Sequence, residues 1–176
     1  TREELTRQIM NEGVEAPRAE LAARLSGGSL YRARELVEDR DGLFEERRQL
    51  VECFIEAGFN GEDGEYWPIA EEFGGRSERG RLEAFLRLCG VYLRDLFMLA
   101  EQRPDDLVNT DRSNRTAAWL EKIRPGRIES AALEVDRAFD DLSRNVDSKL
   151  ILAGLWNGLR HCRRSSPAPS SSRSHP

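Results

Sequence analysis

Apolar residues recur three and four positions apart along most of this chain, the spacing that places side chains on one face of an α-helix. The longest such run lies between residues 77 and 102 and ends before Pro104. It includes Leu82, Phe85, Leu86, Cys89, Tyr92, Leu93, Leu96, Phe97 and Ala100. Nowhere do apolar and polar residues alternate over the length of a strand. The pattern therefore predicts an all-α fold.

The first 39 residues predict a unit of three short helices. Thr1 and Glu4 have the spacing of a capping box, in which each side chain bonds the other's main chain. Gly27 and Gly28 can adopt the positive φ that ends a helix, and Ser29 can cap the next one. Helices this short depend on a neighbouring domain for stability. Because the chain starts at a helix cap, we expect it to be a piece cut at a domain edge.

Residues 43–160 predict a second domain, a bundle of longer helices. We expect helices over 43–55, around Trp67 to Phe73, over 77–102, up to Ile123 after a cap at Thr110 or Asp111, over 128–142, and over 148–159 after a cap at Asp147. Leu150 is expected on the apolar face of the last helix, and residues 58–64 are expected to form a polar loop. Residues 163–176 are rich in Ser, Pro and Arg and predict a disordered tail.

Composition narrows the function classes. The net charge of −5, with charges of both signs, gives no general attraction to nucleic acid or anionic membrane. No apolar run is long enough to span a bilayer, and the polar N-terminus does not resemble a signal peptide, so we expect a cytoplasmic protein. Cys53 and Cys89 are expected to pack on apolar helix faces, and with Cys162 they are too scattered for a disulfide framework.

Candidate catalytic and metal-binding groups are few. His161 has no Cys, Asp or Glu at metal-ligand spacing and is expected to be a solvated group at a helix end. Residues 109–113 alternate oxygen-bearing side chains but lack the glycine and closing glutamate of a calcium loop. Two pairs of adjacent aspartates also occur. Asp105-Asp106 is expected on a loop, and Asp140-Asp141 on a solvated helix face. We therefore assign no catalytic residue, no metal site and no cofactor to this chain.

Three motifs together resemble a known family. Residues 21–36, LAARLSGGSLYRAREL, look like the lid of clamp-loader AAA+ proteins, in particular the delta-prime subunits of bacterial DNA polymerase III. Residues 93–96, LRDL, resemble part of that family's helical collar, and residues 145–152, NVDSKLIL, resemble its C-terminal motif. The family usually has Pro-Gly where this chain has Leu30 and Tyr31, and often proline in place of Ser148.

The resemblance implies a role in assembly. Residues 1–39 would be the lid and 43–160 the collar, which joins other clamp-loader subunits in the ring that places the sliding clamp on primed DNA. Clamp and DNA would be indirect partners, and no membrane partner is implied. Arg32 would occupy the sensor 2 position, which faces nucleotide phosphate in active relatives. From the residues alone, Arg32 could equally be a surface arginine that pairs with Glu35 or a neighbouring glutamate.

Other protein classes also agree with this sequence. The chain could be the same region of a gamma/tau-type clamp-loader subunit or of another AAA+ protein, in which Arg32 would be an active sensor. It could also be an unrelated helical adaptor that binds a protein partner. Aromatic residues near arginines, Tyr92, Trp119 and Trp156, could fill the core or lie at an interface. A helix-bundle metal enzyme is disfavoured, because inward His and Glu pairs are missing.

Overall fold

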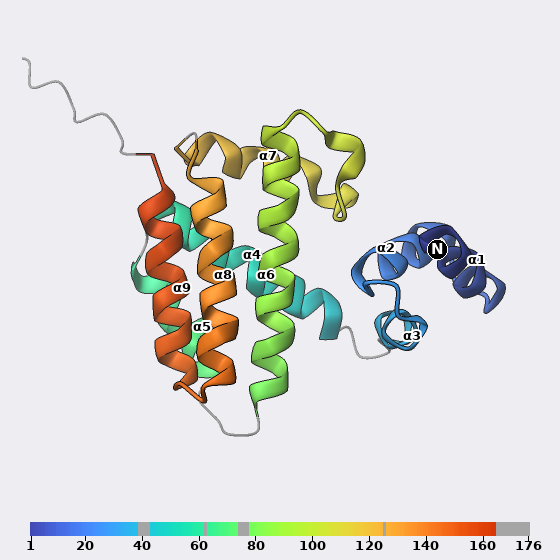
Figure 1. Cartoon of the computed structure of the whole chain (residues 1–176), viewed down its shortest axis with the longest axis horizontal. Helices are drawn as coiled ribbons and strands as arrows, with labels where there is room; N and C mark the ends of the chain where they lie inside the picture. The colour runs from blue at the N-terminus through green and yellow to red at the C-terminus, as the bar shows by residue number, and fades with distance from the viewer. Residues whose placement is uncertain (39–42, 62, 74–77, 125, 165–176) are drawn as a thin grey trace, which may run out of the picture.

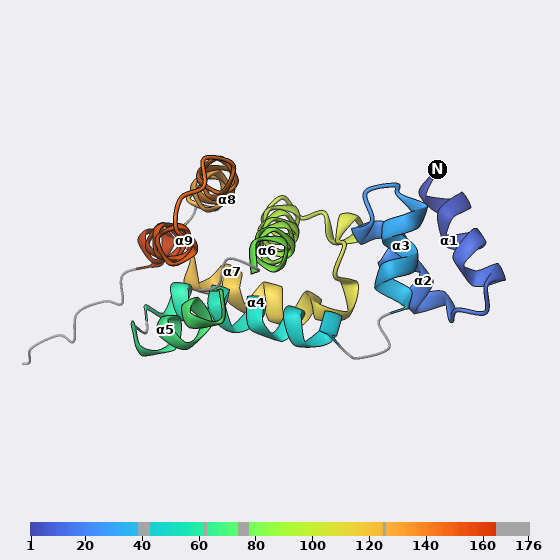
Figure 2. The same cartoon turned by 90° about the horizontal axis from the view of Figure 1, so that it is seen from below.

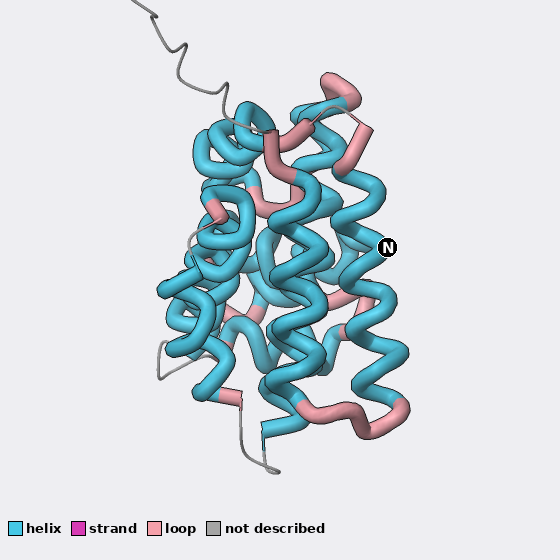
Figure 3. Tube along the Cα trace, turned by 90° about the vertical axis from the view of Figure 1, so that its left-hand side faces the viewer, coloured by secondary structure: helices cyan, strands magenta, loops and turns pink. Residues whose placement is uncertain are grey.

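The chain folds into α-helices. The structure, a computed structural model, describes residues 1–38, 43–61, 63–73, 78–124 and 126–164. These residues form nine α-helices and no β-sheet, as Figure 1 and the tube in Figure 3 show. The prediction of an all-α fold is therefore confirmed.

The first three helices pack around a small hydrophobic cluster of their own. They are α1 (Arg2–Asn11), α2 (Ala16–Leu25) and α3 (Leu30–Val37). Their cluster consists of Leu5, Ile9, Ala19, Ala22, Ala23 and Ala33. The capping box at Thr1 is present, and the side chain of Glu12 after α1 binds Arg34 of α3. This part of the chain lies beside the remaining helices in Figure 1.

The remaining helices form a bundle around a larger cluster. They are α4 (Leu43–Asn60), α5 (Asp63–Glu72), α6 (Arg79–Ala100), α7 (Ser113–Lys122), α8 (Ile128–Ser143) and α9 (Ser148–Cys162). Residues Pro104–Asp106 and Thr110–Arg112 form short 3₁₀ helices between α6 and α7. In Figures 1 and 2, α6, α8 and α9 run side by side, and α4 crosses them on one side. The assignment of 1–39 and 43–160 to separate domains stays a prediction.

Aromatic side chains fill the middle of the bundle. Phe54 meets Phe85 edge to face, with ring centroids 5.3 Å apart, and Tyr92 meets Trp119 at 5.6 Å. Trp156 is also buried. Such pairs contribute about 0.5–1.5 kcal/mol beyond the area they bury. Of the two possibilities for the aromatic residues, the core position is therefore confirmed for Tyr92, Trp119 and Trp156, and these rings are not available to a partner.

Several local predictions are wrong, and the first of them concerns the connection between α4 and α5. Residues 58–64 do not form a loop, because α4 continues to Asn60 and α5 begins at Asp63. A Cβ atom added to Gly58 would lie 2.9 Å from Cβ of Leu159, so this glycine lets α4 and α9 approach closely. Cys53, expected on the apolar face of α4, is exposed, whereas Cys89 is buried as expected.

Three further differences concern helix ends. Neither Thr110 nor Asp111 caps α7 with its side chain; the N-cap is Arg112, and Asp111 instead binds Arg48. Leu150 lies 66% exposed at the start of α9 rather than in the core. Residues 163 and 164, predicted to belong to a disordered tail, are ordered, and the main-chain N–H of Arg164 donates to the Lys122 carbonyl. Residues 165–176 lie outside the described residues.

Candidate functional site: a cleft beside Arg32

The turn between α2 and α3 sets the position of Arg32. Gly27 and Gly28 have φ of +60° and +89°, a conformation that other residues rarely adopt. The Ser29 hydroxyl then accepts a hydrogen bond from the main-chain N–H of Arg32 at 3.3 Å, which starts α3. Both features were predicted from the sequence. They place Arg32 in the first turn of α3, with its side chain exposed.

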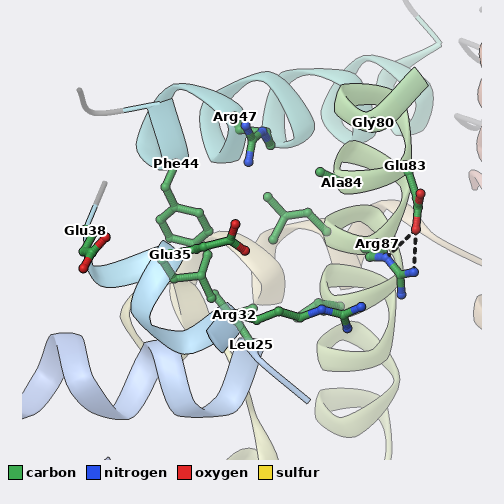
Figure 4. Close-up of a pocket in the computed structure, with 13 residues that line it drawn as sticks. Leu25, Arg32, Glu35, Glu38, Phe44, Arg47, Gly80, Glu83, Ala84 and Arg87 are labelled. Atoms are coloured by element: carbon green, nitrogen blue, oxygen red, sulfur yellow. Dashed lines mark hydrogen bonds and ion pairs between the residues drawn. The ribbon is translucent and has the colours of Figure 1, made fainter. Parts of the chain in front are cut away.

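A cleft of about 690 Å³ lies between Arg32 and the bundle. Its walls come from α3, the start of α4 and one face of α6, and Leu25 at the end of α2 closes one side. Figure 4 shows Arg32 reaching from α3 toward α6, where Arg87 lies. The apolar lining consists of Leu25, Leu36, Phe44, Ala84, Leu88 and Val91. The size is typical of clefts that bind ligands.

Some charged side chains of the cleft form ion pairs with one another, and others do not. Arg87 donates to Glu83 of the same helix at 2.6 Å and lies over the ring of Phe139. Arg32 forms no ion pair with any other residue that the structure describes, so the predicted pairing with Glu35 is absent there. Glu35 instead accepts a hydrogen bond from the Tyr31 hydroxyl, which raises the pKa of Tyr31.

A hydrogen bond joins α2 to a loop of the bundle. Nη1 of Arg24 donates to the carbonyl of Leu107. That loop is in turn fixed by Asp95 of α6, which is 1% exposed and accepts from the main-chain N–H groups of Val108 and Asn109, both at 2.8 Å. The cleft beside Arg32 therefore has walls that are linked through Arg24, the loop and Asp95.

The other candidate residues lie apart from this cleft. His161 is exposed at the end of α9, with Nδ1 2.6 Å from the carbonyl oxygen of Asn157. Asn109 is buried and donates its side-chain amide to Asp95. Asp106 pairs with Arg103 at 2.6 Å, and residues 140–141 lie on α8. The described residues contain no group of three or more His, Cys, Asp or Glu side chains that could hold a metal ion.

A buried polar network between α4, α6 and α7 was missed from the sequence. Glu52 is 1% exposed, accepts a hydrogen bond from the Tyr92 hydroxyl and pairs with Arg112 and Arg115. Burial, followed by the bond to Glu52, raises the pKa of Tyr92. The signal was a charged residue inside an apolar stripe, since Glu52 lies between Val51 and Phe54 on α4.

Arg48 extends this network to the loop before α7. It is 3% exposed and donates to both carboxylate oxygens of Asp111, at 3.0 and 3.1 Å. Two parallel bonds of this kind fix geometry as well as adding energy. The network therefore holds α4 against α6 and α7, and we interpret it as structural.

Comparisons with known proteins give no relative. The chain matches no protein-family model, no curated protein and no solved structure. Within the described ranges, every helix is too short or too polar to cross a lipid bilayer.

Proposed function

We propose that this chain is the C-terminal part of a bacterial DNA polymerase III clamp-loader subunit of the delta-prime type. In this proposal residues 1–39 are the AAA+ lid and residues 43–160 are the collar. The collar would bind other clamp-loader subunits in a ring that places the sliding clamp on primed DNA. Such a protein would work in the cytoplasm.

The observation that carries the proposal is the order of the parts. A three-helix unit with its own small cluster contains the Gly27-Gly28-Ser29 turn, and an exposed arginine follows in the first turn of the next helix. Behind it comes a bundle of longer helices with a second, larger cluster. This order agrees with the resemblance of residues 21–36, 93–96 and 145–152 to one family.

The middle motif has a physical role that supports its place in the proposal. Asp95, within residues 93–96, holds the loop to which Arg24 donates. A buried aspartate on the apolar face of α6 is costly unless it is hydrogen-bonded, and here it fixes the loop that Arg24 contacts. A subunit that positions its neighbours in a ring needs such a fixed joint.

The proposed task is assembly, without catalysis in this chain. The phosphate-binding loop and acidic metal-binding segment of an ATPase are not among its motifs. Arg32 stands in the sensor 2 position by resemblance, and its exposure in a cleft leaves its guanidinium available. In the delta-prime family nucleotide binding is often lost, so we propose no nucleotide for this chain.

Gel filtration with the other clamp-loader subunits of the source organism tests the proposal. We expect the chain to co-elute with them in one complex. Leu133 and Leu150 are 56% and 66% exposed on α8 and α9. Leu133→Glu and Leu150→Glu therefore test whether this surface contacts the other subunits. Met10→Glu, at a position that is 43% exposed on α1, is the matched control. A chain that elutes alone at every concentration contradicts the proposal.

A further inference from the structure

The floor of the cleft beside Arg32 is apolar and only partly covered. Leu25, Leu36, Phe44, Ala84 and Val91 line it, and each is of intermediate exposure. They come from α2, α3, α4 and α6, so the patch is made only where these helices meet. A concave surface with an apolar lining and a few charged groups is typical of a binding cleft.

Two arginines at this cleft lack the partners that other arginines of the chain have. Arg24, Arg48 and Arg87 each pair with a carboxylate of the described residues. Arg32 and Arg47 line the cleft and pair with none of the described carboxylates. In Figure 4 Arg47 extends from α4 toward the space that Arg32 borders from α3. Two guanidinium groups are therefore available to bind carboxylates of a partner.

The charges of the cleft are also arranged by sign. Figure 4 shows Glu35 and Glu38 on the side next to Phe44, whereas Arg32 reaches toward Arg87 on α6. Glu83 also lines the cleft but is paired with Arg87. An anionic group would therefore bind toward α6, and an apolar group would lie between it and Phe44.

We infer that this cleft binds an acidic amphipathic segment of a partner protein, whose apolar side chains cover the floor and whose carboxylates pair with Arg32 and Arg47. This is the helix-in-groove mode of recognition with a charged rim. The inference goes beyond the proposed function, because the cleft is lined by α2, α3, α4 and α6, whereas Leu133 and Leu150 belong to α8 and α9. It stands on the cleft itself and does not require a clamp loader.

Nucleic acid is the less suitable occupant. A phosphate backbone has no apolar side chains to cover Leu36 and Phe44. Nucleic-acid sites instead gather cations along a path. The net charge of −5 adds no general attraction.

The test uses a pair of fluorescein-labelled helical peptides and the whole chain. Both peptides carry leucine and phenylalanine on one face; one has glutamate on the other face and its copy has lysine. By fluorescence anisotropy, we expect the glutamate peptide to bind at least about tenfold more tightly than the lysine copy, since rim charges decide partner choice. Failure of both peptides to bind, or equal binding of both, overturns the inference.

Charge reversal ties the binding to the two arginines. In R32E/R47E we expect the affinity for the glutamate peptide to fall at least about tenfold and the lysine copy to become the preferred ligand. The control R2E/R7E changes the net charge equally at exposed positions of α1, and we expect its affinity to stay within about twofold of the unmodified chain. An equal loss in the control overturns the inference, as does tighter, arginine-dependent binding of a single-stranded oligonucleotide.

Gly80 provides a second test that leaves the charges unchanged. It lines the cleft within α6, and a Cβ atom added there meets no atom within 4 Å. Gly80→Phe should therefore fold, because glycine is a poor helix former and the added Cβ meets no neighbour. We expect this ring to occupy the cleft and abolish binding of the glutamate peptide. Unchanged binding in a folded Gly80→Phe chain places the peptide elsewhere and contradicts the inference.

Discussion

Asp95 and Asn109 are joined twice: Oδ2 of Asp95 accepts the main-chain N–H of Asn109 at 2.8 Å and its side-chain amide at 2.9 Å. Oδ1 accepts the main-chain N–H of Val108 at 2.8 Å, so the carboxylate fixes the loop after α6. Arg24 of α2 donates to Leu107 in that same loop. Asp95 therefore fixes the loop that α2 contacts through Arg24.

Replacing Asp95 by asparagine should weaken this loop. Asparagine has nearly the same shape, but it has no charge and only one acceptor oxygen. The N–H groups of Val108 and Asn109 bind two carboxylate oxygens in the native protein. We expect Asp95→Asn to lower the free energy of unfolding by about 1.5–3 kcal/mol, the range for buried hydrogen bonds to charged groups. Urea unfolding measures it. Asp105→Asn, at an exposed neighbour, is the control and should change stability by less than about 0.5 kcal/mol.

Two glycines in helices should respond with opposite signs to alanine. A methyl group at Gly58 would meet Leu159 at 2.9 Å, so Gly58→Ala should destabilise by about 1–3 kcal/mol through overpacking of α4 on α9. Gly154 in α9 has no atom within 4 Å of its added Cβ, so Gly154→Ala should stabilise by up to about 1 kcal/mol. Thermal unfolding of both variants distinguishes them. A stabilised Gly58→Ala chain would contradict the close helix crossing.

The three cysteines should differ in reactivity toward a thiol reagent such as DTNB. Cys53 is exposed on α4, whereas Cys89 and Cys162 are buried, and burial raises the pKa of both thiols. Because the thiolate is the reactive form, only Cys53 should react promptly in the native protein. The other two should react after the chain is unfolded in guanidinium. Prompt reaction of more than one thiol would show that the core of the bundle is open.

The bond between Tyr92 and Glu52 can be measured by a double-mutant cycle. Tyr92→Phe removes the hydroxyl, and Glu52→Ala removes the carboxylate that this hydroxyl and two arginines share. Because the groups are in contact, the two changes should be coupled by about 0.5–3 kcal/mol. Additive effects on the unfolding free energy would mean that the hydroxyl and carboxylate do not interact in solution.

The sequence predicted local features correctly but did not predict contacts between residues that are far apart in the chain. Local rules were sufficient for the capping box at Thr1, the Ser29 cap and the long helix α6, because these depend on residues within a few positions of one another. They failed at Gly58, which resembles a loop residue but permits a contact with Leu159, far away in sequence. No local rule contains that contact.

The site was predicted only in part for the same reason. The turn at Gly27 and Gly28 correctly placed Arg32 at the start of a helix, with its side chain exposed. The cleft itself needs α6 opposite α3, so Arg47 and Gly80 could not be assigned to it from the sequence. Glu52 and Asp95 were missed because helical periodicity marks apolar stripes and does not show which buried charge has a partner.

Native mass spectrometry of the chain mixed with the remaining clamp-loader subunits tests the central claim most directly. If the chain is the C-terminal part of a delta-prime-type subunit, its 20.1 kDa mass should be found within a heteromeric complex that includes those subunits. A Leu133→Glu or Leu150→Glu variant that is missing from this complex should remain helical by circular dichroism. Spectra that contain only the free chain, at concentrations where the other subunits assemble, would contradict the account.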